Sequence, residues 1–323
     1  MKKSWILSLL LVVILPQLLF AVLTADGLQG EPIPTVGDLK TETDVLSLLR
    51  ILDGDEIIEM PLDDYVACVV MGEMPVSFEE EALKAQAVAV RTYTLRSILL
   101  GSKHTEAYIC TESSCCQAFV NFKEDSVNKE GIEKVRNAVK DTAGEVITYQ
   151  GNLIDATYFS CSGGKTEDAV AVWGANVPYL QSVASPGEEN AGCFKSRVTF
   201  SRQAFKSKLG LPADLSITQD GIHIEHTAGG GVDSLNISGY EFSGVEVRSF
   251  LSLPSTNFII TVSSDEIIID TKGYGHRVGM SQYGAEAMAV EGKNYKEILA
   301  HYYTDTILET YSPQQINAIF DKE

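Results

Sequence analysis

The sequence predicts an α+β fold that follows a single-pass N-terminal membrane anchor, and three observations support this prediction. The segment from Trp5 to Leu23 is almost entirely apolar. Residues 78–100 have helical periodicity without Gly or Pro, and short strand-like segments follow at irregular intervals. Because helices and strands do not alternate regularly, we expect a mixed ectodomain with a buried central helix and antiparallel strands.

The apolar N-terminus has the properties of a membrane segment. Its length is close to the ~20 residues that span a bilayer, and Lys2 and Lys3 favour a cytoplasmic N-terminus with an exported body. A cleaved signal peptide is the alternative, but it needs a shorter apolar region and small residues at a cleavage site. We therefore expect a location in the cell membrane, with this division of the chain: a cytoplasmic tip (1–4), a transmembrane signal anchor (5–25), a tether (26–44), one domain (45–312) and a tail (313–323).

The charge of the chain excludes some partners. Its formal net charge is −19, and Lys and Arg are dispersed without a basic run. This pattern argues against nucleic acid as a ligand. An anionic wall polymer would have to be held by a local site rather than by the overall charge.

Several elements are predicted from local patterns. The turn Asp53-Gly54-Asp55 predicts a hairpin, and Ser77 with Glu80 predicts a capping box for the helix over 78–100, which Gly101 ends. A more polar helix is expected over 126–142, and residues 184–240 are read as a possible insertion. The remaining predictions are strands at 144–149, 153–160, 245–250, 257–262 and 267–270, and helices at 281–292 and 295–303.

Glu73 is the first candidate for chemistry. It lies between two methionines in Gly72-Glu73-Met74-Pro75, just before the long helix. Apolar surroundings raise the pKa of a carboxyl group, whereas a helix N-terminus favours the anion. Such opposed influences suit an acid/base near neutral pH, although a Glu that only decorates a helix entry would fit the spacing as well.

Four blocks of sequence resemble the stage II sporulation protein D family, which also includes the amidase-enhancer proteins. They span about residues 45–312 in the expected order. The blocks are Pro61 to Tyr93, which contains Gly72-Glu73-Met74-Pro75; Tyr158-Phe159-Ser160-Cys161-Ser162-Gly163-Gly164-Lys165-Thr166-Glu167; Gly273-Tyr274-Gly275-His276-Arg277-Val278-Gly279-Met280-Ser281-Gln282-Tyr283-Gly284-Ala285; and Ile298-Leu299-Ala300-His301-Tyr302-Tyr303.

The resemblance implies a peptidoglycan lytic transglycosylase that acts during engulfment in sporulation. Such an enzyme cleaves the bond from N-acetylmuramic acid to N-acetylglucosamine in peptide-free glycan strands, leaving 1,6-anhydro ends. One carboxylate suffices because the sugar's own 6-hydroxyl is the nucleophile, whereas ordinary glycosidases use two. Glu73 matches the catalytic position. The implied partners are stage II sporulation proteins P, an amidase/endopeptidase, and M. A non-catalytic wall-binding amidase enhancer is the alternative.

The resemblance also points to a metal site in the loop Cys110 to Gln117. Relatives often carry Cys, then His five residues on, then Cys-Gln, and here Cys115 stands at the His position. Thiolate and imidazole both bind zinc, so Cys110 and Cys115 are candidate ligands, with Cys116, a histidine or water completing the set. A disulfide or free thiols are the alternatives, and a bridge between Cys161 and Cys193 is another possibility.

The other blocks supply candidates for substrate binding. Gly163 lets a sugar approach the backbone, and polar side chains around it offer hydrogen bonds. His276 and Gln282 are expected to position substrate, whereas Arg91 and Tyr93 either hold the sugar or satisfy the core. The full set of candidates is Arg91, Tyr93, Ser160, Ser162, Gly163, Thr166, Glu167, His276 and Gln282.

Overall fold

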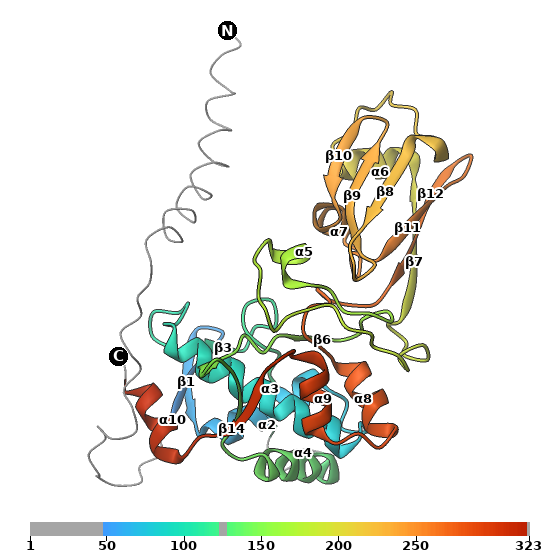
Figure 1. Ribbon diagram of the computed structural model, residues 1–323. Helices are drawn as coiled ribbons and strands as arrows, with labels where there is room; N and C mark the ends of the chain where they lie inside the picture. The colour runs from blue at the N-terminus through green and yellow to red at the C-terminus, as the bar shows by residue number, and fades with distance from the viewer. Residues whose placement is uncertain (1–47, 123–127, 322–323) are drawn as a thin grey trace. The chain divides into compact units, whose positions relative to one another are not determined.

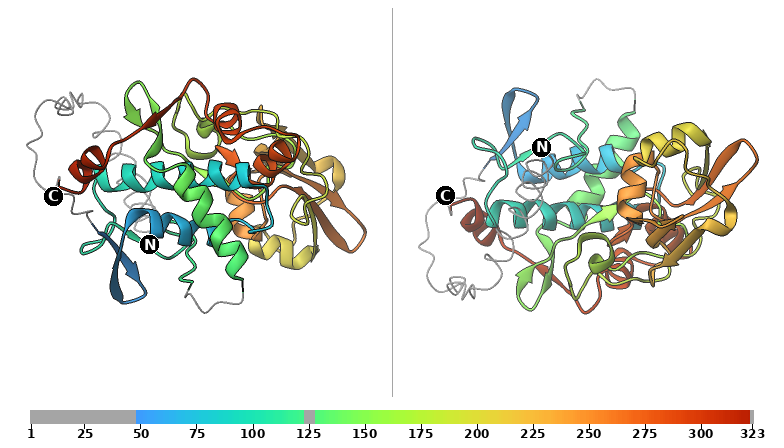
Figure 2. Two further views of the ribbon diagram at one scale, coloured as in Figure 1. Left: turned by 90° about the horizontal axis from the view of Figure 1, so that it is seen from below. Right: turned by 90° about the horizontal axis from the view of Figure 1, so that it is seen from above.

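The helix α3 (Glu80–Leu99) lies at the centre of the first of two hydrophobic clusters. The buried residues of this first cluster run from Leu49 to Phe320. The computed structural model describes residues 48–122 and 128–321, and within them α3 contacts α2 (Leu62–Glu73), α4 (Lys129–Asp141), α8 (Gln282–Val290) and α9 (Tyr295–Tyr302). Its alanines let these neighbours approach closely. Figure 1 and both views of Figure 2 show α2 and α4 beside α3. The predicted buried central helix is confirmed.

The predicted capping box at the start of α3 is wrong. Phe78 packs its ring against Tyr283, with 5.1 Å between the centroids, and its N–H donates to the carbonyl of Pro75 at 3.0 Å. This turn delays the helix to Glu80, and no side chain caps it. The N–H of Glu79 donates instead to the carboxylate of Glu286 on α8.

Three small sheets border the first cluster. The predicted hairpin is confirmed as β1 (Leu49–Asp53) and β2 (Glu56–Met60), with β3 (Ile109–Cys110) parallel to β1. A second sheet has the order β14-β4-β5 and is antiparallel, and the third joins two short strands in parallel. Their bounds are β4 (Glu145–Tyr149), β5 (Asn152–Leu153), β14 (Ile307–Thr310), β6 (Tyr158–Phe159) and β13 (Met280–Ser281).

Two antiparallel sheets and two helices enclose a second hydrophobic cluster, whose buried residues run from Phe205 to Ile269. The sheets are β11-β12-β7 and β10-β9-β8. Their elements are β7 (Lys195–Ser201), α6 (Arg202–Lys208), β8 (Ile222–His226), β9 (Val232–Ile237), β10 (Tyr240–Ser243), α7 (Gly244–Leu251), β11 (Phe258–Val262) and β12 (Glu266–Lys272). The division of the chain at 184–240 stays a prediction.

The strand predicted over 245–250 is wrong, because these residues form α7. The Ser243 hydroxyl accepts the N–H of Glu246 at 3.2 Å, and the Glu246 carboxylate accepts the N–H of Ser243 at 2.8 Å. This capping box starts a helix that buries Val247 and Leu251 against β9. The helices expected near 126–142, 281–292 and 295–303 are confirmed as α4, α8 and α9.

The predicted fold class needs one correction, at the N-terminus. The anchor expected over residues 5–25 and the tether over 26–44 lie outside the described residues. Within the described ranges, no helix is both long and apolar enough to cross a membrane, since the longest, α3, carries Lys84, Arg91 and Arg96. We therefore describe a mixed α/β protein and withdraw the single-pass anchor and the membrane location derived from it. The predicted tail contains a helix, α10 (Pro313–Phe320).

Candidate functional site

Glu73 is the last residue of α2, and a close backbone contact fixes its position. A side chain at Gly72 would lie 3.0 Å from the backbone of Ala118, so glycine lets the segment 118–120 run directly against α2. The N–H of Val120 donates to the carbonyl of Cys68 at 3.1 Å. In this arrangement the N–H of Ala118 donates to Glu73 Oε1 at 2.8 Å.

The second oxygen of the Glu73 carboxylate contacts a helix that is distant in the sequence. Gln282, the first residue of α8, donates from Nε2 to Glu73 Oε2 at 3.2 Å. Gln282 thus contacts Glu73, and its expected role in positioning substrate stays a prediction. Burial raises the pKa of the Glu73 carboxyl group, and the hydrogen bonds from Ala118 and Gln282, together with the nearby side chain of Tyr158, oppose that rise.

A chain of polar side chains continues from Glu73 into the first cluster. The hydroxyl of Tyr158, on β6, donates to Gln117 Oε1 at 2.8 Å. Gln117 in turn donates from Nε2 to Tyr65 and Thr94, both at 3.1 Å. Burial keeps the pKa of Tyr158 well above its ordinary value, so its hydroxyl keeps its proton as a donor.

His276 holds Tyr158 from the other side. Its Nδ1 accepts the N–H of Val278 at 3.2 Å, so Nε2 carries the proton and donates to the carbonyl of Tyr158 at 3.0 Å. Burial lowers the pKa of His276 to about 4, which keeps the ring neutral. The ring also packs on Phe159 and Trp173. The structure thus gives His276 a positioning contact to Tyr158.

A cavity of about 320 Å³ lies beside this network. Trp173, at the end of α5 (Ala169–Trp173), is 44% exposed there. The volume of the cavity is at the lower end of the range for small-molecule sites. The cavity is lined by Tyr93, Arg96, Ser97, Leu100, Gly101, Lys103, Tyr108, Cys116, Asp155, Thr157 and Trp173. Tyr93 is therefore the sequence candidate that borders an open space.

Arg91, by contrast, is buried and bonded within the protein. Its Nη2 lies 3.1 Å from Asp63 Oδ1 and 3.2 Å from the carbonyl of Val139, and its Nη1 donates to the carbonyl of Glu145 at 3.3 Å. The side chain has no exposed surface. This placement favours the alternative in which Arg91 satisfies the core.

The candidates from Ser160 to Glu167 also bond mainly to protein groups. Glu167 forms a buried ion pair with Arg277 at 3.1 Å, and Thr166 accepts the N–H of Val183 at 2.8 Å. Ser160 lies 3.6 Å from the sulfur of Cys193. Ser162 and Gly163 bond to the carboxylate of Glu188, which sequence reasoning missed. The local sequence did not indicate Glu188, since Ser162, Gly163 and Ser281 among its partners come from distant segments.

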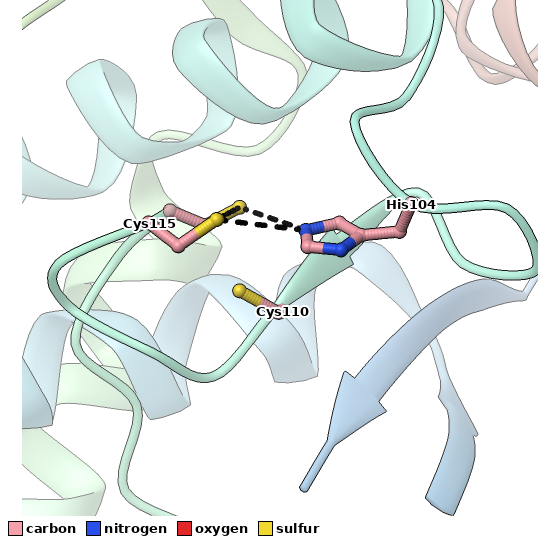
Figure 3. Close-up of side chains that lie close together, drawn as sticks. His104, Cys110 and Cys115 are labelled. Carbon is pink, nitrogen blue, oxygen red and sulfur yellow. Dashed lines mark hydrogen bonds between the residues drawn. The ribbon is translucent and has the colours of Figure 1, made fainter. Parts of the chain in front are cut away.

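Four side chains from the segment 104–116 converge into a candidate metal centre. The ligand atoms of His104, Cys110, Cys115 and Cys116 all lie within 4.8 Å of one another, and Figure 3 shows His104, Cys110 and Cys115 facing a common point. His104 Nε2 lies 3.8 Å from Cys115 Sγ and 3.5 Å from Cys116 Sγ, and the two sulfurs are 3.9 Å apart. Around tetrahedral zinc, such ligand atoms are about 3.5 to 3.8 Å apart.

The residues therefore fit a closed three-cysteine, one-histidine zinc set. The predicted pair Cys110 and Cys115 belongs to it, and His104 had no assignment from the sequence. All six cysteines are within the described ranges and none forms a disulfide there. Gln117 and Ala118, which contact the network around Glu73, follow Cys116 directly.

These features define a class of protein with one half-buried carboxylate beside a cysteine-rich metal-ligand cluster, and comparison with known proteins defines the family. The profile of the stage II sporulation protein family matches residues 53–149. Stage II sporulation protein D of Bacillus subtilis (strain 168) is 38% identical over 261 residues, which cover 78% of this chain and 76% of that protein. The protein of the same name from Bacillus amyloliquefaciens is 38% identical over 251 residues, 76% of this chain and 73% of that protein.

The chain belongs to the stage II sporulation protein D family, a sporulation family, as the resemblance of the sequence blocks indicated. An amidase enhancer of Bacillus subtilis (strain 168) is also similar, with 30% identity over 299 residues. That match covers 75% of this chain but 40% of the enhancer.

Proposed function

We propose that this protein is a peptidoglycan lytic transglycosylase in which Glu73 acts as general acid and then as general base. The observation that supports the proposal most is the setting of Glu73: burial raises the pKa of its carboxyl group, while Ala118 and Gln282 hold both oxygens. No neighbouring carboxylate among the described residues contributes to that shift. One carboxylate suits a reaction whose nucleophile belongs to the substrate.

In the proposed reaction, protonated Glu73 gives its proton to the glycosidic oxygen as the bond to the anomeric carbon of N-acetylmuramic acid breaks. The 6-hydroxyl of the same sugar forms the new bond to that carbon, and its proton passes to the Glu73 carboxylate. The carboxyl group is restored and no water is consumed. Gln282 and Ala118 stabilise the anionic stage by donating hydrogen bonds to it.

We place a sugar of the strand in the cavity bordered by Tyr93 and Trp173. Aromatic faces and a few polar groups are typical of ligand sites. Arg96 lies 3.8 Å from Asp155, a distance longer than a hydrogen bond, so its guanidinium has donors to offer a sugar carboxylate. The net charge of −19 repels an anionic strand, so a local cation such as Arg96 is required to bind its carboxylates.

The zinc ion is part of the proposal. We assign His104, Cys110, Cys115 and Cys116 as its ligands, because the spacing of their donor atoms fits a tetrahedral ion. When bound, zinc would supply structural cross-linking with no open coordination position. The residues that hold it would fix the loop whose continuation reaches Glu73.

We also propose that the protein acts during engulfment in sporulation. Its proposed partners are those implied by the family, stage II sporulation proteins P and M. A non-catalytic amidase enhancer is the second candidate function, and the similarity to a protein of that name supports it. In that case the cavity would bind glycan strands and Glu73 would have no chemical role.

An assay with peptide-free glycan strands tests the proposal. The wild-type protein should release fragments from the strands, whereas Glu73→Gln should bind strands and release none. Glu286→Gln is a matched control, since burial also raises the pKa of Glu286 and a backbone N–H also donates to it. Strand binding without cleavage by the wild type would support the enhancer instead, and an active Glu73→Gln would remove Glu73 from the mechanism.

A further inference from the structure

Glu188 is a buried carboxylate that joins three segments of the chain. It is 1% exposed. Its Oε2 accepts the N–H groups of Ser162 and Gly163, at 2.8 and 3.1 Å, and the thiol of Cys161 lies 3.1 Å away. Its Oε1 accepts the hydroxyls of Ser185 and Ser281, both at 2.6 Å. A buried carboxylate keeps its position only when its lone pairs are satisfied in this way.

The directions of these hydrogen bonds require a group that only accepts. Ser281 Oγ accepts the N–H of Gly284 at 3.3 Å, which leaves its own proton for Glu188. Ser162 Oγ likewise accepts the N–H of Gly164 at 2.9 Å and donates to Glu188. A carboxylate can accept all of these protons, whereas an amide would place two of its own in the same space.

The bond to Ser281 connects Glu188 to the candidate catalytic residue. Ser281 is the N-cap of α8, and the next residue, Gln282, donates to Glu73 Oε2 at 3.2 Å. The start of α8 is held a second time, because the N–H of Tyr283 donates to the carbonyl of Ser160 at 3.0 Å, within the loop that Glu188 binds. Glu188 thus braces both the helix start and the loop beside it.

We propose that Glu188 is a positioning residue, which fixes the start of α8 and thereby directs the side-chain amide of Gln282 at the Glu73 carboxylate. It touches neither Glu73 nor the proposed sugar cavity. The inference rests on the proposed function, in which Glu73 must be protonated to begin cleavage.

The proposal makes a specific statement about pH dependence. The hydrogen bond from Gln282 lowers the pKa of Glu73. Loss of that bond therefore raises the pKa, and Glu73 stays protonated to a higher pH. Since the protonated form is the active one, the alkaline limb of the profile of kcat against pH should move upward. A residue that served stability alone would change the amount of folded enzyme but not the position of this limb.

The test compares Glu188→Gln, Ser281→Ala and Gln282→Ala by the pH profile of kcat on peptide-free glycan strands. We expect each variant to lower the plateau and to move the alkaline limb upward by about half a pH unit or more. The double variant Glu188→Gln/Gln282→Ala should move no further than Gln282→Ala alone. Val247→Ala, which truncates the second hydrophobic cluster, is the control: it should lower Tm and leave the limb in place.

The outcomes separate this proposal from the proposed function. A wild type that cleaves no strand would overturn both. A wild type and Gln282→Ala that behave as expected, with Glu188→Gln and Ser281→Ala at the wild-type limb, would overturn only the role of Glu188. If Glu188→Gln does not fold, Ser281→Ala alone decides, because it removes the connecting hydroxyl and keeps the carboxylate.

Discussion

At the scale of single residues, the site depends on groups whose protonation the surroundings fix. Glu73 is balanced between burial, which favours the acid, and the hydrogen bonds from Ala118 and Gln282, which favour the anion. Tyr158 keeps its proton, and His276 stays neutral. A neutral His276 is what allows Nδ1 to accept from Val278 while Nε2 donates to Tyr158. Each of these states follows from burial combined with hydrogen-bond geometry.

His276 should make stability depend on pH. Its pKa in the folded protein, about 4, lies below the ordinary value of 6.5. The unfolded chain therefore binds the proton more readily, so stability is full above about pH 6.5 and falls as the pH drops toward 4, by at most about 3 kcal/mol. Urea unfolding of the wild type and His276→Gln at several pH values between 6.5 and 5 measures this. Equal slopes for the two proteins would contradict the assignment.

The candidate residues from the sequence lie in two kinds of surroundings, and their roles toward a substrate stay predictions. Gln282 touches Glu73, because the family motif carries it at a helix start. Arg91 and Glu167 instead satisfy buried partners. A polar residue in a motif can serve either substrate or fold, and only the tertiary contacts distinguish the two. Glu188 had no signal in the local sequence, since two distant segments, at Ser162 and Ser281, supply most of its hydrogen bonds.

At the scale of elements, two predictions were wrong for the same reason: a short capping pattern does not decide by itself where a helix begins. The pattern Ser-x-x-Glu occurs at Ser77, where we predicted a capping box, and at Ser243, where we predicted a strand, and only the second one forms a capping box. At Ser77, packing of Phe78 on Tyr283 holds the chain in a turn. At Ser243, the apolar residues Val247 and Leu251 have a cluster to pack against once the helix forms. A capping pattern therefore starts a helix only where the helix also buries its apolar side chains.

The proposed zinc ligands, His104, Cys110, Cys115 and Cys116, should hold the loop that leads to Glu73 once the metal is bound. We expect the purified protein to contain one zinc ion per chain by elemental analysis, and Cys110→Ser or Cys115→Ser to lose it. Both variants should also lower Tm and slow strand cleavage, because Gln117 and Ala118 follow the last ligand. Cys193→Ser, outside the cluster, serves as the control and should keep the metal. Unchanged metal content in Cys110→Ser and Cys115→Ser would show that these thiols do not bind it.

At the scale of the whole molecule, a buried ion pair links the loop after β6 to the turn between β8 and β9. Glu167 accepts from Arg277 Nη1 at 3.1 Å and from the N–H of Gly231 at 2.7 Å. Arg277 also donates to the carbonyl of Gly229 at 2.7 Å. Charged and backbone hydrogen bonds therefore connect residues beside the second cluster's sheet to the motif loop.

Glu167→Ala should be strongly destabilising for this reason. It leaves the Arg277 guanidinium buried without its counter-ion, a change that costs about 3 kcal/mol or more. Arg197→Ala breaks the pair with Asp270, whose members are partly exposed, and should leave Tm almost unchanged. Denaturant titration of both variants measures the contrast. Similar free energies of unfolding for the two would mean that the buried pair contributes no more than a surface pair.

The overall fold class was predictable only in outline. Helical patterns identified α3, α4, α8 and α9, whereas the 12-residue α2 buries every residue from Tyr65 to Val70, shows no amphipathic pattern and was not predicted. The two-residue strands β3, β5, β6 and β13 were not resolvable as such, since pairing with distant partners, not propensity, defines them. Likewise, local sequence patterns could not predict the surroundings of Glu73. They form only when α2, the loop after Cys116 and α8 come together in the tertiary structure.

The most direct test of the central claim is to follow the oxygen atom during cleavage. Peptide-free glycan strands are incubated with the wild type in heavy-oxygen water, and the products are read by mass spectrometry. We predict fragments that lack one water relative to hydrolysis products and carry no heavy oxygen, because the 6-hydroxyl of the sugar closes the ring under Glu73 catalysis. Reducing ends that carry heavy oxygen would contradict this account, since they would require water as the nucleophile and a second catalytic carboxylate.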